Sequence, residues 1–473
     1  MYAICKTIHP PTQIEHCVYC HFYNREEKNL ITAGATQLKV FRLILEVDDD
    51  ENSSNEFVGS NEPMTNDASK SKESKVKLEC CQTFSFFGNI MSIESVSLSD
   101  SSRDSLLIGF SDAKLSIVEY DPNTHDLKTL SLHYFEEDEM KIGYNSSNQV
   151  PVVRADPEGR CAAFLIYNKN IVILPFRKEI ISDDHDSHIP MSTSSPQTSV
   201  PSTPSLGAKS PVLASYKLDL NTEQYGDKVN NIIDIEFLYN YYEPTLLILY
   251  EPIRTWAGRV AVRQDTCSML VLSLNVQQRV HPHIWSMSHL PFDCFRAIAV
   301  PKPIGGVVIF AVNSLIHLNQ GLPPYGISLN SFTDFSTSFP LKVQDEITIS
   351  LDCSHACFIS NEKLVISLKN GDLYVLNLFN DMTRSIRGFN FDKAASSVLT
   401  TCMTYCGNQY LFLGSRLGHS LLLHFTEKPY EEKQDKNDKA DNDLDISDSN
   451  DVKPNLTNSE HHSDDEDLSA YND

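Results

Sequence analysis

The segment Cys17–His21 (CVYCH) contains side chains that could attach haem or bind a metal ion. Its C-x-x-C-H pattern is typical of covalent haem attachment, and His16 beside it would add a fourth zinc ligand. The run Cys17–Tyr23 favours a β-strand, however, and in a strand Cys17 and Cys20 point to opposite faces. No second Cys/His pair follows at zinc-finger spacing. We therefore expect neither haem nor zinc at this motif.

A second candidate ligand set is the alternating series Cys353, His355 and Cys357. In a β-strand these three side chains would point to one face. Three ligands are too few for a structural zinc site, and the flanking residues are apolar. We expect these cysteines to pack in the core as small apolar side chains. The same expectation holds for four further cysteines: Cys80, Cys81, Cys402 and Cys406.

The sequence lacks the common motifs of nucleophilic and nucleotide-dependent catalysis. No G-x-S-x-G elbow, P-loop or G-x-G-x-x-G follows a predicted strand. The adjacent carboxylates Glu136 and Glu137 follow a predicted strand, which favours solvated surface charge over general acid–base catalysis. We therefore expect a protein that is not an enzyme, with no cofactor and no small-molecule substrate.

Three arginines and a tryptophan are clustered within ten residues: Arg254, Trp256, Arg259 and Arg263. Arginine and tryptophan are enriched among the residues that dominate protein–protein binding energy, so the cluster is a candidate partner contact. RNA binding would also use arginine with an aromatic ring. A structural alternative is a hairpin insertion whose tryptophan caps the fold and whose arginines pair with acids such as Asp265. All three interpretations remain open at this stage.

Four residues are candidate phosphorylation sites. Ser195, Thr203 and Ser210 each precede proline, as in the substrates of proline-directed kinases, and Ser463 precedes a run of acidic residues. Phosphate would add negative charge to segments that are already polar.

Seven β-hairpins recur along the chain and must position these residues. Each consists of an apolar strand, a tight turn rich in Gly, Asn, Asp or Ser, and a second apolar strand. They span Leu30–Leu43, Leu106–Tyr120, Cys161–Phe176, Thr245–Leu274, Val307–Asn319, Lys363–Leu378 and Tyr410–Phe425. The strongest turn signal is Asn370-Gly371, for which we expect a type I′ turn.

Further strands, such as Ile90–Leu98 and Val398–Met403, lie between the hairpins, so each repeat has about four strands. Four strands form one blade of a β-propeller, in which radial sheets bury each other's faces. We expect an all-β, seven-bladed β-propeller, with a blade count between six and eight. The chain has two tryptophans and no Trp-Asp pair, so it differs from an ordinary WD40 protein.

Polar, acidic segments interrupt the hairpins. We expect a propeller over residues 1–428 with disordered loops at 46–75 and 182–212, followed by a disordered acidic tail at 429–473. The formal net charge is −24, of which residues 46–73, 179–214 and 428–473 together carry −20. The remaining residues are nearly neutral, which argues against a broad electrostatic role in nucleic-acid binding.

The sequence has no apolar run of eighteen residues and no N-terminal secretory signal. We therefore expect no membrane partner. Twelve cysteines without such a signal indicate a reducing compartment with free thiols.

Several long strings resemble one known family. The most specific are DAKLSIVEYDPNTHDLKTLSLHYFEE (Asp112–Glu137), RADPEGRCAA (Arg154–Ala163), TWAGRVAVRQDTCS (Thr255–Ser268) and LFLGSRLGHSLLL (Leu411–Leu423). They are similar, in order, to the N-terminal third of the large subunit of the cleavage and polyadenylation specificity factor. That family is related in fold to the large subunit of the damaged-DNA-binding complex.

The resemblance implies the first propeller of a three-propeller nuclear scaffold that acts in pre-mRNA 3′-end processing. It implies partnership with zinc-finger and WD-repeat subunits and support of AAUAAA signal recognition, with RNA contacted mainly by those partners. Direct binding of the signal RNA by the propeller is the alternative. Because the sequence ends near the linker to the second propeller, the resemblance also implies a fragment, a truncated gene model or a short isoform.

Overall fold

The structure is a computed structural model that describes residues 11–46, 75–99, 101–141, 150–177, 210–220, 225, 228–344, 347–381 and 385–428. The described residues up to Thr426 belong to one compact unit. Their strands form seven sheets, which follow one another along the chain and are numbered here as blades 1 to 7.

Blades 1 to 4 each contain four strands. Blade 1 contains β1 (His16–Cys20), β2 (Asn29–Gly34), β3 (Gln37–Glu46) and β4 (Lys75–Ser85). Blade 2 contains β5 (Ile90–Ser97), β6 (Asp104–Phe110), β7 (Lys114–Asp121) and β8 (Asp126–Tyr134). Blade 3 contains β9 (Val152–Ala155), β10 (Cys161–Ile166), β11 (Asn170–Pro175) and β12 (Tyr216–Lys217). Blade 4 contains β13 (Ile232–Phe237), β14 (Thr245–Tyr250), β15 (Cys267–Ser273) and β16 (His283–Leu290).

Blades 5 to 7 vary in strand number within the described residues. Blade 5 contains β17 (Cys294–Ala299), β18 (Val307–Ala311), β19 (Ser314–Leu318), β20 (Tyr325–Ser328) and β21 (Lys342–Val343), the last parallel to β20. Blade 6 contains β22 (His355–Phe358), β23 (Lys363–Ser367), β24 (Asp372–Asn380) and β25 (Ile386–Ser396). Blade 7 contains β26 (Cys402–Tyr405), β27 (Tyr410–Gly414) and β28 (Leu421–His424).

The described helical segments are short: α1 (Asp138–Lys141), the 3₁₀ helix η2 (Ala257–Arg259) and α2 (Thr333–Ser336). In this part of the chain, none is long and apolar enough to cross a membrane.

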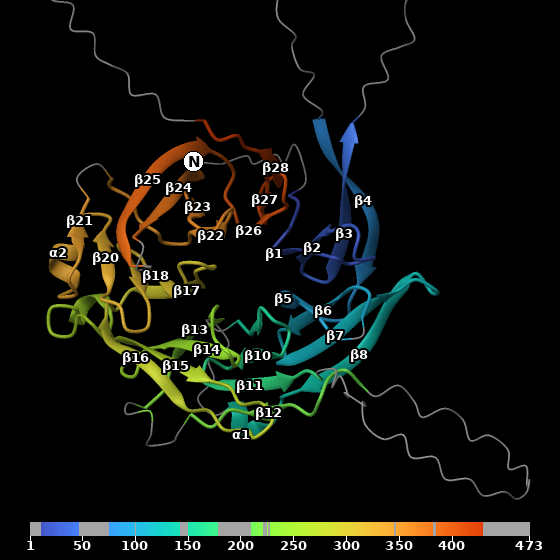
Figure 1. Cartoon of the computed structure of the whole chain (residues 1–473), viewed down its shortest axis with the longest axis horizontal. Coiled ribbons are helices and arrows are strands. Elements are labelled where there is room, and N and C mark those ends of the chain that lie inside the picture. Colours follow the sequence, from blue (N-terminus) through green and yellow to red (C-terminus); the bar gives the residue numbers. More distant parts are fainter. Residues whose placement is uncertain are drawn as a thin grey trace, which may run out of the picture. The chain divides into compact units, whose positions relative to one another are not determined.

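The seven sheets are arranged radially, with the first strand of each sheet nearest the centre (Figure 1). These first strands contact one another around the ring, for example β1 with β5, β5 with β9, and β13 with β17. The prediction of an all-β, seven-bladed propeller is therefore confirmed. All seven predicted hairpins form the second and third strands of their blades.

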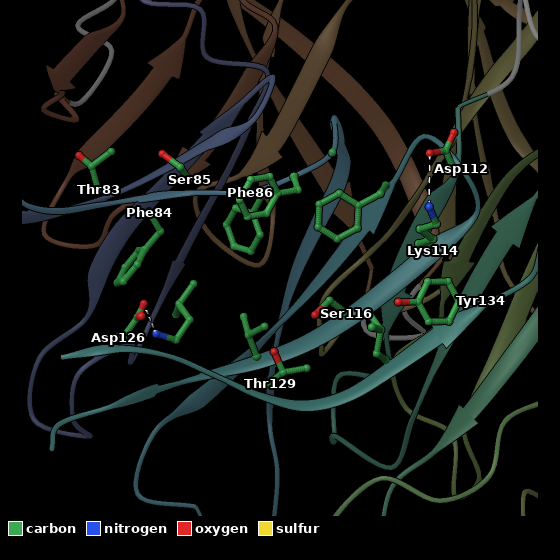
Figure 2. Close-up of a pocket in the computed structure, with 16 residues that line it drawn as sticks. Thr83, Phe84, Ser85, Phe86, Asp112, Lys114, Ser116, Asp126, Thr129 and Tyr134 are labelled. Carbon is green, nitrogen blue, oxygen red and sulfur yellow. Dashed lines mark hydrogen bonds and ion pairs between the residues drawn. The ribbon is translucent and has the colours of Figure 1, made fainter. Parts of the chain in front are cut away.

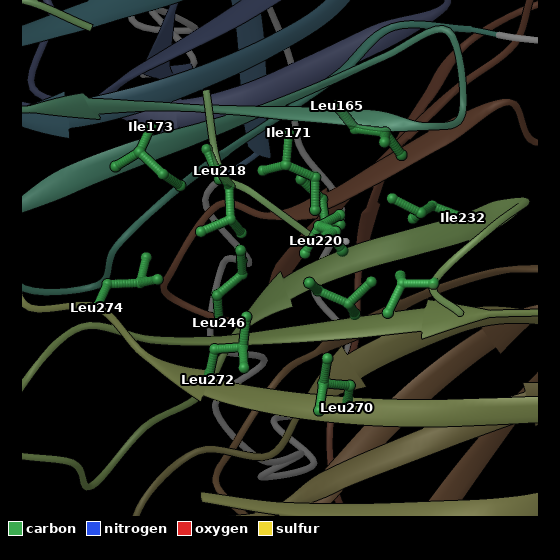
Figure 3. Packing of buried hydrophobic residues seen from close by; sticks show 14 of the residues in the cluster. Leu165, Ile171, Ile173, Leu218, Leu220, Ile232, Leu246, Leu270, Leu272 and Leu274 are labelled. Atoms are coloured by element: carbon green, nitrogen blue, oxygen red, sulfur yellow. The ribbon is translucent and has the colours of Figure 1, made fainter. Parts of the chain in front are cut away.

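The hydrophobic core lies between neighbouring blades rather than in one central mass. Figure 3 shows one such layer, in which Leu165 and Ile171 of blade 3 face Leu246 and Leu270 of blade 4. The middle strands are covered on both faces, so every residue of β10 and of β14 is buried. Outer strands have one solvated face, and β8 accordingly alternates between exposed and partly buried residues.

The start and the end of the described chain meet and close the ring. The N–H of Thr12 donates to the carbonyl of Gly418 (3.1 Å), and the N–H of Ile14 donates to that of Ser415 (3.2 Å). The hydroxyl of Thr401 donates to the carbonyl of Ile14 (2.6 Å). Strand β1 of blade 1 then lies against β26 of blade 7 (Figure 1).

Two local predictions differ from the structure. The strand expected at Val398–Met403 begins only at Cys402. At Asn370-Gly371 only Gly371 has a positive φ (+88°), so the turn is not type I′, which needs positive φ at both residues. A Cβ on Gly371 would lie 2.4 Å from the carbonyl oxygen of Ser397, which explains why glycine occupies this position.

Residues 47–74, 178–209 and 429–473 lie outside the described residues and include most of the segments predicted to be disordered. In the sequence these three segments follow β3 of blade 1, β11 of blade 3 and β28 of blade 7, respectively. Val212, at the end of the second predicted loop, is buried and pairs with Phe176.

Candidate functional site

The first strands of the blades enclose a central channel of about 590 Å³. Arg154 of β9 lies there among three carboxylates from the adjacent blades. Its guanidinium is 3.1 Å from Glu236, 3.6 Å from Asp234 and 3.7 Å from Glu94. Asp234 also accepts a hydrogen bond from the N–H of Ala297 in β17 (3.0 Å). The cluster therefore connects blades 2, 3, 4 and 5 around one cation.

Burial opposes the charge of Arg154, but the Glu236, Asp234 and Glu94 carboxylates outweigh it and raise the pKa of the guanidinium. Burial also raises the pKa of Glu94, and it raises that of Glu236 to about 7, although Arg154 acts in the opposite direction. Arg154 is thus the ion-pair partner of all three carboxylates, and Arg296 of β17 lines the same channel.

Two histidines line the same channel. Burial lowers the pKa of His16 to about 4, and burial together with Arg296 and His16 lowers that of His355 to about 4. Both imidazoles are therefore neutral at physiological pH and resist protonation on acidification.

The first prediction concerns acid stability. Between about pH 6.5 and pH 4 the unfolded chain protonates His355 while the folded chain does not, so folding free energy is lost as the pH falls. In His355→Gln this loss should be smaller, by about 1.4 kcal/mol per pH unit for the one proton removed. Urea unfolding across this range would measure the slope, with the exposed His283→Gln as control. Equal slopes for His355→Gln and the unmodified chain would contradict the prediction.

The Cys17–His21 motif lies largely in β1. Cys20 packs between blades 1 and 2, and Cys17 packs between blades 7 and 1, so the two thiols point to opposite faces as predicted. Within the described ranges, no three or more His, Cys, Asp and Glu side chains are placed to hold a metal ion.

The expectation that Cys353, His355 and Cys357 share one strand face is wrong. Strand β22 begins at His355, and Cys353 precedes it in an exposed turn with φ of +54°. Only the partly buried Cys357 packs in the layer between blades 6 and 7.

The core expectation is also wrong for Cys80 and Cys81, which are exposed because β4 is the outermost strand of blade 1. Cys406 is buried as expected, and Cys402 is partly buried.

A groove of about 630 Å³ runs between blades 1 and 2. Figure 2 shows Phe84 and Phe86 on one wall and Tyr134 and Lys114 on the other. Lys114 lies 3.1 Å from Glu136, so this predicted surface carboxylate takes part in an exposed ion pair. Aromatic rings and hydroxyl groups dominate the lining, which suits it to contact with an apolar side chain.

The predicted arginine–tryptophan cluster occupies the connection between β14 and β15 in blade 4. The carboxylate of Glu251 holds both ends of this insertion by accepting from the N–H of Thr255 (2.9 Å) and the hydroxyl of Thr266 (2.7 Å). The hydroxyl of Thr255 donates to the carbonyl of Arg263 (3.1 Å), and Val260 is buried beneath the loop. The insertion is therefore an ordered loop with an internal anchor.

All four cluster residues, Arg254, Trp256, Arg259 and Arg263, are exposed. Trp256 is 60% exposed, and the guanidinium of Arg259 lies 5.3 Å from its ring centre. Among the described residues, no carboxylate lies within ion-pair distance of the three arginines. Asp265 instead accepts from the hydroxyl of Thr337 (2.5 Å) and the N–H of Ser338 (3.0 Å). The structural alternative, a capping tryptophan with paired arginines, is therefore wrong.

Sequence reasoning missed two aromatic residues beside this loop. Phe332 and Phe335 lie at helix α2, which follows β20 of blade 5. The side chain of Gln264 donates to the carbonyl of Phe335 (3.3 Å), which fixes α2 against the insertion (Figure 1). Phe335 is 77% exposed. Two phenylalanines in the otherwise polar run Asn330–Ser338 were a signal that could have indicated them.

We refer to the exposed side chains of this region as the Trp256–Phe335 surface. It comprises Ile253, Arg254, Trp256, Arg259, Val262, Arg263, Phe332 and Phe335.

Of the candidate phosphorylation sites, only Ser210 is described. It is exposed, and its carbonyl accepts a hydrogen bond from the guanidinium of Arg177 (3.3 Å). Ser195, Thr203 and Ser463 lie outside the described residues.

Seven radial sheets of three to five strands define a β-propeller, and exposed aromatic and cationic side chains lie on the connections of blades 4 and 5. The family model described as the RSE1/DDB1/CPSF1 first beta-propeller matches residues 68–456, so the chain belongs to this family. This finding confirms the resemblance inferred from the sequence.

Individual relatives agree with the family match. The chain is 48% identical over 428 residues to cleavage and polyadenylation specificity factor subunit 1 of Drosophila melanogaster, covering 90% of this chain and 28% of that protein. It is 34% identical over 361 residues to the Arabidopsis thaliana subunit of the same name, covering 74% and 24%. It is 26% identical over 437 residues to Protein CFT1 of Debaryomyces hansenii, covering 89% and 31%. The chain thus spans less than a third of the length of these curated relatives.

Proposed function

We propose that this chain is a non-catalytic scaffold module of the pre-mRNA 3′-end processing machinery, acting in the nucleus. The observation that carries the proposal is the 48% identity to a cleavage and polyadenylation specificity factor subunit, which extends over 90% of this chain. The Trp256–Phe335 surface supports a binding role, because exposed aromatic and arginine side chains are typical of interface hot spots.

In this proposal the module binds the zinc-finger and WD-repeat subunits of the complex and thereby supports AAUAAA recognition. The propeller contributes a rigid frame with loops that are free to contact partners. RNA is contacted chiefly through those subunits. The near-neutral charge of the chain outside its three acidic segments supports an indirect role.

Direct binding of the polyadenylation-signal RNA is the second candidate. The stacking of Arg259 on the exposed Trp256 ring favours it, since bases stack on such platforms.

The second prediction separates these functions. After nuclease treatment, the tagged chain should still co-purify with the zinc-finger and WD-repeat subunits, because protein contacts do not require RNA. Direct RNA binding would instead weaken steeply with salt and on Arg259→Ala or Arg263→Ala. Loss of every subunit after nuclease treatment, together with salt-dependent RNA binding, would refute the scaffold proposal.

A further inference from the structure

We propose that the Trp256–Phe335 surface binds a partner segment in which acidic side chains alternate with large apolar ones. This inference rests on the proposed scaffold function and adds the chemistry of the partner and the residues that meet it.

The apolar part of the surface is too prominent for solvent contact alone. Trp256, Val262 and Phe335 are 60%, 84% and 77% exposed, and Ile253 and Phe332 are more than half exposed. Because these side chains are exposed, they add nothing to the hydrophobic core between the blades. Covering them would release apolar area from water, which is the main favourable term in protein association.

The charge of the surface selects an acidic partner. Arg254, Arg259 and Arg263 have no carboxylate at ion-pair distance among the described residues. Of the acids in this region, Glu251 accepts hydrogen bonds from Thr255 and Thr266, and Asp265 accepts them from Thr337 and Ser338. Asp334 of α2 is exposed and forms no ion pair with the three arginines. Carboxylates of a partner can therefore pair with guanidinium groups that the fold leaves available, in the bidentate geometry that arginine favours.

The surface is also preorganised. The anchors at Glu251 and the bond from Gln264 to Phe335 hold the two halves of the surface, from blades 4 and 5, in a fixed arrangement. Binding then costs less conformational entropy than it would for a loop that orders only on contact.

A protein segment fits this surface better than RNA does. Arg259 on Trp256 could stack a base, but Ile253, Val262 and Phe335 offer aliphatic and aromatic area that a phosphate backbone does not cover. Acidic and apolar side chains together match both components of the surface, and a nucleic acid matches only one.

The test uses Trp256 itself as the reporter. The chain has two tryptophans, and Trp285 is partly buried with its indole N–H donated to the hydroxyl of Tyr241 (3.2 Å). In a Trp285→Phe variant, all tryptophan fluorescence comes from Trp256. The probes are a synthetic peptide of about 12 residues alternating Asp or Glu with Leu or Phe, the same peptide with Asn and Gln replacing the acids, and an oligouridylate of equal length.

The acidic peptide should shift the Trp256 emission to the blue and reduce its quenching by acrylamide, whereas the amide peptide should bind at least about tenfold more weakly. Arg259→Gln and Phe335→Ala should each weaken binding of the acidic peptide by about tenfold. The matched controls in blade 6, Arg387→Gln and Phe379→Ala, should leave it unchanged.

Equal binding of the two peptides, or a Trp256 signal from the oligouridylate alone, would overturn the inference. Failure of the inference is distinguishable from failure of the proposed function. If the acidic peptide does not bind the chain with an intact surface, and the double variant Arg259→Gln/Phe335→Ala still co-purifies with the complex subunits, the scaffold function stands without this site. If the peptide binds and no subunit co-purifies, the site stands and the scaffold function fails.

Discussion

Replacing Arg160 with leucine is expected to lower the free energy of unfolding by about 3 to 5 kcal/mol, because it leaves a buried carboxylate without its cation. Arg160 is 6% exposed, and Asp156 is 0% exposed. The guanidinium donates to both carboxylate oxygens of Asp156, at 2.7 and 2.8 Å, and to the carbonyl of Tyr242 at 2.7 Å. The pair therefore fixes the β9–β10 turn of blade 3 to the β13–β14 connection of blade 4. Urea unfolding followed by circular dichroism would measure the change.

The matched control for this prediction is Arg387→Leu, which removes an exposed ion pair with Asp381 in blade 6 and should cost less than about 1 kcal/mol. Removing both partners, as in Asp156→Leu/Arg160→Leu, should recover part of the loss since no unpaired charge is then left buried. A loss at Arg160 no larger than that at Arg387 would contradict the argument.

Replacing Arg154 with methionine is expected to destabilise the propeller by about 3 to 5 kcal/mol near pH 8 and by clearly less near pH 5. The substitution leaves Glu94, Asp234 and Glu236 facing one another in the channel without their ion-pair partner. Because burial already raises the pKa of Glu236 to about 7, loss of Arg154 should raise the carboxylate pKa values further. The folded variant then binds more protons than the unfolded chain, so its stability falls as the pH rises.

Urea unfolding of Arg154→Met and of the unmodified chain at both pH values would test whether the loss of stability is larger at the higher pH. Arg154→Lys serves as the control, since it keeps a cation in the channel and should retain part of the stability. A deficit that is the same at both pH values would show that Arg154 acts through packing rather than through charge.

The hairpins could be predicted because their signal is local. The second and third strands of blade 3, Cys161–Ile166 and Asn170–Pro175, are covered by neighbouring blades on both faces and are therefore written as nearly continuous apolar runs. The outer strands carry no such signal. This explains why Cys80 and Cys81 were placed in the core, although the outermost position of β4 exposes them.

The candidate surface was predicted only in part. Arg254, Trp256, Arg259 and Arg263 lie within ten residues, so composition alone identified them. Phe332 and Phe335 are distant in the sequence and come from the next blade. Only the packing of blade 4 against blade 5, and the bond from Gln264 to Phe335, bring them to the same place.

The sequence by itself determined the repeating hairpins, the family and the location of the arginine–tryptophan cluster, because each depends on residues close together in the chain. The tertiary structure alone decided which thiols are buried, which acids Arg154 must neutralise, and that Thr12 and Ile14 close the ring against Gly418 and Ser415. A propeller brings one strand from every blade to a common axis, so its channel and its closure join residues that are hundreds of positions apart, and no local pattern encodes such contacts.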